Sequence, residues 1–193
     1  MSRRASLWLL WAALMAPPGL LCWQALRPEA DMDAAVAASG NWAIAWLVLA
    51  LVLTPLARLL PVLRSGLWLR RAVGLAAFAA SLVHLWLYML GMQAYAEPGG
   101  LWALIWAEAF TPGILTGWAA LILLLLPALA SNDAAMRSLR RAWKPVQRLA
   151  WPAAVLALLH MAVVHDGLML ALAVAGAAAA LQLMRFFPAT RKA

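Results

Sequence analysis

The chain has three histidines, His84, His160 and His165, and the first of them lies in an unusual place. His84 belongs to the sequence SLVHLWLY, inside a run from 72 to 92 that has no charged side chain. An imidazole in such surroundings is costly to bury unless a partner satisfies it. It can bind a metal through a ring nitrogen, exchange a proton, or hydrogen-bond to a neighbouring helix. His84 is therefore a candidate functional residue, and its partner has to be found.

The composition indicates which elements position this histidine. The chain is 67% hydrophobic and 11% charged, which is far from the balance of a soluble domain. Its apolar runs are about 20 residues long, the length a helix needs to cross about 30 Å of hydrocarbon. No ten-residue alternation typical of membrane strands is present. We expect an all-α integral membrane protein with one domain over 1–193. Its bundle of six transmembrane helices is predicted at about 7–26, 41–60, 72–92, 112–130, 149–165 and 167–187.

The first predicted span begins like a signal peptide, with Arg3 and Arg4 ahead of LWLLWAALMA. However, PPG at 17–19 is followed by further apolar sequence, LLCWQAL, and we expect the segment to be retained as a span. Cys22 is the only cysteine, so neither an intramolecular disulfide nor a cysteine metal cluster is expected.

The net charge of +8 comes from basic residues that are distributed as the predicted topology requires, and not as in a nucleic-acid-binding protein. If the chain crosses six times, every basic residue except Arg27 lies on one side. By the positive-inside rule both termini are then cytoplasmic, and no nucleic-acid partner is expected. The residues on that side are Arg3, Arg4, Arg58, Arg64, Arg70, Arg71, Arg137, Arg140, Arg141, Lys144, Arg148, Arg185, Arg191 and Lys192.

Two of the segments that connect the predicted spans are expected to have a structural or binding role of their own. The inner segment 131–148 can begin a helix with Ser131 or Asp133 as its cap, and its apolar face is opposite a basic one. Such a helix would lie on anionic membrane lipid or dock a partner. The outer segment 101–110 carries tryptophans typical of the membrane interface, and it could also cover the mouth of a site. Gly113 and Gly117 form a G-x-x-x-G pattern, which favours close helix contact.

The spacing of the histidines from the inner charges gives His84 a partner. His84 follows Arg71 by 13 residues, and His160 follows Arg148 by 12. At 1.5 Å per residue both imidazoles lie about 18–20 Å from the inner boundary, on helices that run in the same direction. Two imidazoles at one depth suit the axial ligation of a haem iron.

Structural hydrogen bonds between helices are the alternative use of these histidines, and from the residues alone both uses stay open. A proton relay finds no carboxylate within the spans, and two histidines alone make a poor zinc shell. His165 falls near the outer surface, where we expect a surface group, although a partner contact or a substitute ligand stays open.

Over about 40 to 187 the chain resembles the MsrQ (YedZ) family of the ferric-reductase-like transmembrane group. In that family the haem-binding membrane subunit serves a periplasmic protein-methionine-sulfoxide reductase. The residues that carry the resemblance are SGNWA at 39–43, LVLTPLARL at 51–59, RRAVGLAAFAASLVHLWLY at 70–88, FTPGILTGW at 110–118 and RAWKPVQRLAWPAAVLALLH at 141–160.

The resemblance implies a cytochrome b that carries electrons across the membrane, with His84 and His160 as the haem b ligands. It implies a periplasmic molybdenum-cofactor reductase as the catalytic subunit, with this chain as its electron-transfer subunit. Arg70 and Arg71, with the inner loop, would receive the electron donor or hold its anionic groups. The donor would be a quinol or a flavin reductase, with FMN as a further cofactor, and the sequence does not choose between them.

The chain departs from the family at one informative position. The family usually has another histidine 13 residues before the one matched by His160, where this chain has Gln147. The corresponding position before His84 is Arg71, whose guanidinium offers no lone pair. We therefore expect one haem per chain. The competing function is that of a small non-redox transporter or assembly factor with structural histidines.

Overall fold

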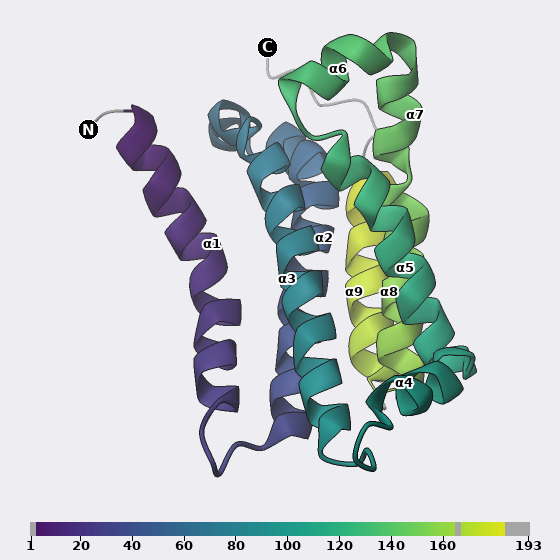
Figure 1. Ribbon diagram of the computed structural model, residues 1–193. Helices are drawn as coiled ribbons and strands as arrows, with labels where there is room; N and C mark the ends of the chain where they lie inside the picture. Colours follow the sequence, from purple (N-terminus) through teal and green to yellow (C-terminus); the bar gives the residue numbers. More distant parts are fainter. Residues whose placement is uncertain (1–2, 165–166, 184–193) are drawn as a thin grey trace, which may run out of the picture.

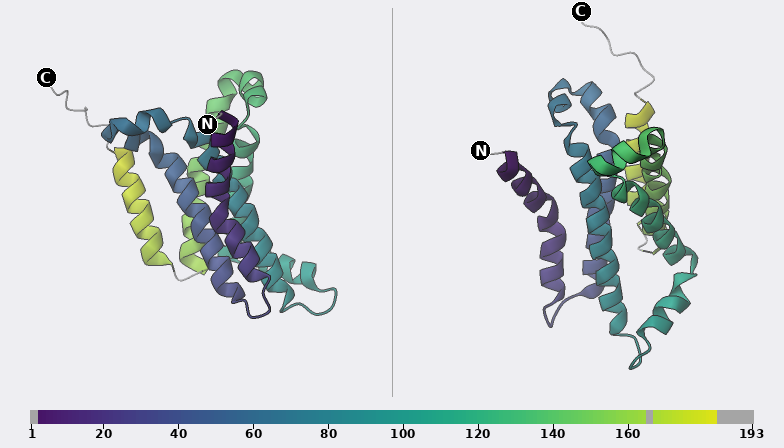
Figure 2. Two further views of the ribbon diagram at one scale, coloured as in Figure 1. Left: turned by 90° about the vertical axis from the view of Figure 1, so that its left-hand side faces the viewer. Right: turned by 45° about the horizontal axis from the view of Figure 1, so that its top comes forward.

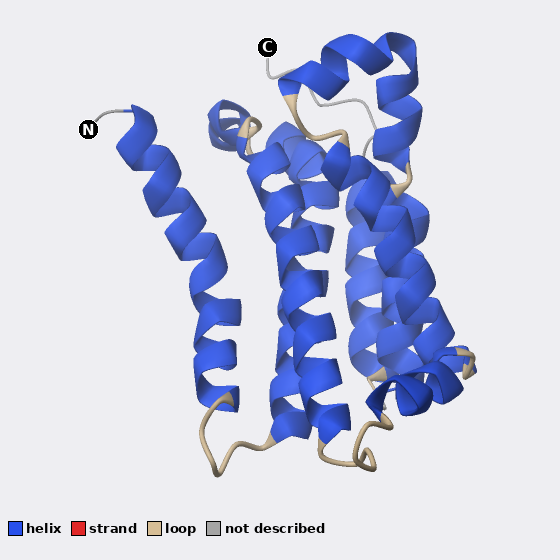
Figure 3. Ribbon diagram, viewed as in Figure 1, coloured by secondary structure: helices blue, strands red, loops and turns tan. Residues whose placement is uncertain are grey.

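The computed structural model describes residues 3–164 and 167–183, and the regular elements within these ranges are helices. Long apolar helices lie side by side and alternate in direction along the chain (Figure 1). Figure 3 shows the same bundle coloured by secondary structure, and its described residues form helices and loops. The predicted all-α class is confirmed. The long helices are α1 (Arg3–Ala25), α2 (Met32–Leu59), α3 (Leu69–Gln93), α5 (Pro112–Leu129), α8 (Ala150–Val164) and α9 (Leu168–Leu183).

Several of these helices are long and apolar enough to cross a membrane. Within the described ranges they are α2, α3, α5 and the stretch Asp133–Val164, which ends with α8. Helix α9 is apolar but shorter. The chain is therefore a multi-pass membrane protein, and the count of six crossings stays a prediction.

The predicted spans agree with the helix bounds to within a few residues, except at α2. This helix begins at Met32, well before the predicted start of the second span at 41. The Asp31 carboxylate accepts a hydrogen bond from the Ala34 N–H at 3.0 Å, which caps the first turn. Helix α2 thus extends beyond its apolar part, because the cap, rather than hydropathy, decides where it starts.

Short helices occupy the connections at both ends of the bundle. Helix α4 (Leu101–Ala109) lies at one end, and α6 (Asp133–Leu139) and α7 (Trp143–Arg148) lie at the other (Figure 1). The side chains of Trp102 and Trp106 on α4 are 71% and 68% exposed, as an interfacial segment requires. The 3₁₀ turn Pro61–Gly66 is at the same end as α6, so the basic connections gather there.

The segment 131–148 differs from its prediction in two respects. It is not one helix, because α6 ends at Leu139 and Arg140 has a positive φ of 46°. Its cap is neither Ser131 nor Asp133 but Asn132, whose Oδ1 accepts a hydrogen bond from the Ala135 N–H at 2.8 Å. The Ser131 hydroxyl instead donates to the Pro127 carbonyl at 2.7 Å.

The bundle is organised around two helix pairs. Helix α2 packs most extensively on α3, and α5 packs most extensively on α8. Fully buried alanines, such as Ala77 and Ala153, let the backbones approach closely. Helix α1 lies on the outside beside α2 and α3 (Figure 2). One apolar cluster joins the pairs and contains Leu47, Leu51, Ala77, Leu124, Ala153 and Ala154.

Candidate functional site

A cavity of about 490 Å³ lies between the two helix pairs. Residues of α2, α3, α5 and α8 line it, most of them apolar, together with both His84 and His160. Its volume falls within the range of small-molecule and cofactor sites, which is about 300–1,000 Å³. The cavity is thus large enough for a cofactor, and its wall includes the two histidines that the sequence analysis identified.

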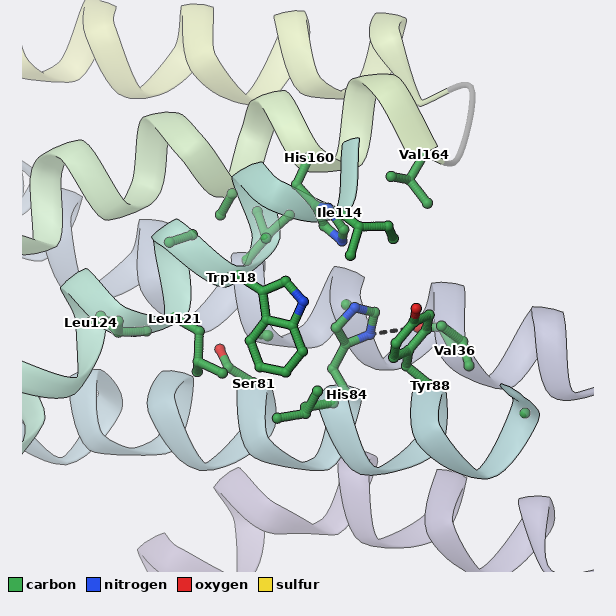
Figure 4. A pocket seen from close by; sticks show the side chains of 18 of the residues that line it. Val36, Ser81, His84, Tyr88, Ile114, Trp118, Leu121, Leu124, His160 and Val164 are labelled. Atoms are coloured by element: carbon green, nitrogen blue, oxygen red, sulfur yellow. Dashed lines mark hydrogen bonds between the residues drawn. The ribbon is translucent and has the colours of Figure 1, made fainter. Parts of the chain in front are cut away.

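The two imidazoles point toward one another across this cavity, His84 from α3 and His160 from α8 (Figure 4). Their ring centroids are 6.0 Å apart, and the ring planes are at 79° to each other. The prediction that the two rings lie at the same depth is confirmed by this contact. Trp118 of α5 lies beside them in the cavity wall (Figure 4).

Each imidazole is oriented by a backbone carbonyl of the neighbouring helix in its own pair. The Nδ1 of His84 is 3.0 Å from the Val36 carbonyl oxygen on α2. The Nδ1 of His160 is 2.8 Å from the Gly113 carbonyl oxygen on α5. A carbonyl only accepts hydrogen bonds, so both Nδ1 atoms donate and both rings carry their lone pair on Nε2. This is the tautomer of a histidine that binds a metal through Nε2.

The His84 ring has an additional contact that the His160 ring does not share in the same form. Ser39 is fully buried, and its Oγ is 3.0 Å from the Nδ1 of His84. The Ser39 hydroxyl donates to the Val36 carbonyl at 2.7 Å, so its oxygen accepts from the imidazole. The sequence analysis quoted Ser39 only as part of SGNWA. Its position in a Ser-Gly pair on a helix facing His84 is the signal that could have found it.

The separation of the two rings fits one metal ion between them. An imidazole nitrogen bonds a metal at about 2.0–2.1 Å and lies about 1.2 Å from the ring centroid. Two imidazoles on opposite sides of one ion therefore have centroids about 6.4 Å apart. The observed 6.0 Å is close to this value. No group of three or more His, Cys, Asp or Glu residues converges in the part of the chain that the structure describes. The donor set thus consists of two imidazoles at a separation that suits ligation of one haem iron.

Arg70 and Arg71, which the sequence analysis also assigned to a cofactor, are not among the residues that line the cavity. The Nε of Arg70 donates to the Ala50 carbonyl at 3.1 Å on α2. Arg71 donates from Nε to the Ser131 carbonyl and pairs with Asp133, both at 2.6 Å. Both arginines are exposed at the basic end of the bundle. The structure therefore separates them from the histidine site, and a role toward an electron donor stays a prediction.

Gln147 reaches the same turn as Arg71. Its Nε2 donates to the Pro127 carbonyl at 3.1 Å and to the Ser131 hydroxyl at 3.3 Å. Arg71 and Gln147 occupy the positions where an inner haem would need histidines. Both side chains instead bind the segment around Ser131. There they connect α3 and α7 to the end of α5.

The Arg71–Asp133 ion pair predicts a pH-dependent inner segment. The Arg71 guanidinium holds the pKa of the Asp133 carboxyl below its usual value of 3.8. Because this pKa is lowered in the folded chain, the stabilising effect is present above about pH 4. It is lost as the pH falls through the lowered pKa. We expect Asp133→Asn to speed trypsin cleavage at Arg137, Arg140 or Arg141, by at most about fivefold because exposed ion pairs contribute little.

The matched control for this change is Glu97→Gln, an exposed carboxylate at the opposite end of the chain's bundle. Cleavage of the inner segment should be the same in Glu97→Gln and in the unmodified protein. If Asp133→Asn is cleaved no faster than these two, the ion pair does not restrain the segment.

The cavity also contains polar residues that the sequence analysis did not connect with the histidines. Tyr88 lies one turn after His84, and its hydroxyl donates to the Glu108 carboxylate of α4 at 3.1 Å. Glu108 and Asp33 both line the cavity, although the sequence analysis found no carboxylate within the spans. Glu108 escaped notice because only the folding back of α4 brings it there. His165 lies outside the described residues.

The comparisons with known proteins agree with this architecture. Residues 39–158 match the family model of the ferric reductase like transmembrane component. A protein of Rhodospirillum rubrum is 37% identical over 155 residues, which cover 79% of this chain and 72% of the relative. A protein of Xanthomonas oryzae pv. oryzae is 35% identical over 163 residues, covering 77% and 70%.

Both relatives are named protein-methionine-sulfoxide reductase haem-binding subunit MsrQ. A third relative with that name, from Xanthomonas euvesicatoria pv. vesicatoria, is 34% identical over 159 residues, covering 77% of this chain and 70% of its own. No solved structure matches the chain. On these matches the chain belongs to the MsrQ family of ferric-reductase-like transmembrane proteins.

Proposed function

We propose that this chain is the haem b-binding, electron-transfer subunit of a protein-methionine-sulfoxide reductase system in a bacterial inner membrane. One observation carries the proposal most directly. His84 and His160 face each other at 6.0 Å, and each donates its Nδ1–H to a backbone carbonyl. This arrangement leaves the Nε2 atom of each ring as the ligating nitrogen, on two imidazoles that line the same cavity.

Each part of the chain has a defined task in this function. A haem bound here would supply a one-electron iron couple. His84 and His160 would be its axial ligands, and the Val36 and Gly113 carbonyls hold the two rings in the ligating tautomer. The lining from α2, α3, α5 and α8 is mostly apolar and would lower the polarity around a bound redox group, which tunes its potential.

The partners follow from family membership and from the distribution of charge. The relatives are named as subunits of a methionine sulfoxide reductase, so we propose a separate catalytic subunit on the outer side. From the sequence resemblance this subunit is a periplasmic molybdenum-cofactor reductase, and this chain delivers electrons to it rather than acting on methionine sulfoxide itself. The positive-inside rule places both termini in the cytoplasm.

The electron donor is proposed to act at the basic end of the bundle. Arg70 and Arg71 are exposed there, beside the basic segment that contains α6 and α7. Guanidinium groups at this surface would bind the anionic part of a donor such as the phosphate of FMN. A quinol is the other donor, and it would approach through the membrane lipid.

The absorbance spectrum of the purified protein tests the cytochrome assignment. Protein produced with an adequate haem supply should show a Soret band, and an α band should sharpen on reduction with dithionite. Bands of this kind distinguish a cytochrome b from a small transporter or assembly factor with structural histidines. Colourless protein would refute the proposed function.

A further inference from the structure

A glycine lies one helical turn after each carbonyl that orients a histidine. Gly40 follows Val36 by four residues on α2, and Gly117 follows Gly113 by four residues on α5. In an α-helix the carbonyl of residue i accepts the N–H of residue i+4, and the Cβ of residue i+4 is tilted back toward that carbonyl. A residue without Cβ at this position leaves the second lone pair of the carbonyl accessible to a side chain from another helix.

Both glycines are in contact with the imidazoles themselves. A Cβ built on Gly40 would lie 3.1 Å from Cε1 and 3.2 Å from Nδ1 of His84. A Cβ built on Gly117 would lie 2.9 Å from both Cε1 and Nδ1 of His160. Separations of this size are shorter than ordinary van der Waals contact. Either ring would therefore have to move away from its carbonyl if the glycine carried a methyl group.

We propose that Gly40 and Gly117 are positioning residues for the two histidine ligands. Each glycine lets one imidazole donate Nδ1–H to a helix carbonyl and thereby keeps Nε2 directed into the cavity. This inference rests on the proposed function, because it assigns the glycines to histidines that bind haem. It goes beyond that function by naming backbone positions on α2 and α5 that determine the geometry of ligation.

Other glycines of the chain show that the arrangement is local. A Cβ on Gly176 of α9 would meet nothing within 4 Å, and a Cβ on Gly74 of α3 would lie 3.9 Å from the Ala50 Cβ. Alanine at these two positions is therefore tolerated sterically and should favour the helix. Gly113 is different, since its Cβ would lie 2.7 Å from Val164 and would disturb the packing of α5 on α8 directly.

The test compares four alanine variants of the full-length protein. Gly40→Ala and Gly117→Ala should each lower the affinity for haem by about 10-fold or more, the effect typical of lost outer partners of a metal ligand, and haem occupancy should fall accordingly. The remaining ferric haem should show a changed low-spin electron paramagnetic resonance signal. The effect should be larger for Gly117→Ala, where the contact is shorter. Gly74→Ala and Gly176→Ala should match the unmodified protein in both measurements.

Thermal unfolding of the haem-free protein separates positioning from folding. Gly74→Ala and Gly176→Ala should unfold at or above the temperature of the unmodified protein, because alanine favours the helix. Gly40→Ala and Gly117→Ala combine this gain with the cost of displacing an imidazole, and a cooperative unfolding transition in both shows that the fold is intact. Wild-type haem occupancy and an unchanged resonance signal in both Gly40→Ala and Gly117→Ala would overturn the inference. If the unmodified protein itself binds no haem, the proposed function fails instead, which is a distinguishable result.

Ser39→Ala provides a second test that does not crowd either ring. The substitution removes the hydroxyl that lies 3.0 Å from the Nδ1 of His84 and leaves Gly40 and the Val36 carbonyl in place. We expect full haem occupancy with a shifted reduction midpoint, because hydrogen bonds to Nδ1–H tune the basicity of an axial imidazole. A midpoint identical to that of the unmodified protein would contradict a role for the Nδ1 contacts.

Discussion

Replacing His84 or His160 with alanine is expected to remove haem from the purified protein. Each substitution deletes one of the two imidazoles, whose ring centroids are 6.0 Å apart. The Ser39 and Ser81 hydroxyls at the cavity are poor ligands for haem iron, and the Tyr88 hydroxyl donates to Glu108 instead. The affinity for haem should therefore fall by more than about 100-fold, beyond what the loss of an outer hydrogen-bond partner costs. The Soret absorbance per protein measures the effect.

Added imidazole provides a matched control for these variants. The alanine leaves a space with the shape of the lost ring, so free imidazole should restore a low-spin spectrum if the fold is intact. His165→Ala is the control at the third histidine of the sequence, and we expect its spectrum to be unchanged. If His165→Ala loses the haem and His160→Ala keeps it, His160 is not the ligand.

One haem per chain is the second expected result. At the inner level the positions that would need imidazoles are Arg71 and Gln147. Both are engaged at Ser131, where Arg71 binds the carbonyl at 2.6 Å and Gln147 the hydroxyl at 3.3 Å. An arginine offers no lone pair, and an amide is a weak ligand beside imidazole. The chain has three histidines, and two of them belong to the outer site.

Pyridine haemochrome absorbance against protein concentration gives the ratio, which should be about one, with a single reduction step. A reproducible ratio near two with two separable reduction steps would contradict the single site. It would require a ligand other than histidine near Ser131.

Much of the fold was predictable because hydropathy and charge act along the chain. Apolar runs located the long helices to within a few residues except at the start of α2, and the spacing from Arg71 and Arg148 placed His84 and His160 at one depth. The G-x-x-x-G pattern of Gly113 and Gly117 correctly indicated close contact of α5 with another helix. These features depend on one helix at a time, or on its distance from the membrane boundary.

The hydrogen bonds and ion pairs between helices could not be predicted from a single sequence. The hydrogen bond from His84 to the Val36 carbonyl depends on how α2 and α3 rotate against each other. The contacts of Arg71 were not visible in the sequence either, because the fold of the segment around Ser131 brings a carbonyl and a carboxylate to its guanidinium. The break at Arg140 was missed for a similar reason, since the amphipathic pattern continues across it.

The division of the site between two helix pairs sets an order for its biogenesis. Helices α2 and α3 follow one another along the chain, so the ring of His84 can be oriented as soon as this hairpin is inserted. His160 reaches its carbonyl only after α8 has been synthesised and has packed on α5. With the two ligands proposed above, capture of the cofactor has to follow the synthesis of α8. An unfinished chain that ends before α8 presents one fixed imidazole and cannot hold a haem between two.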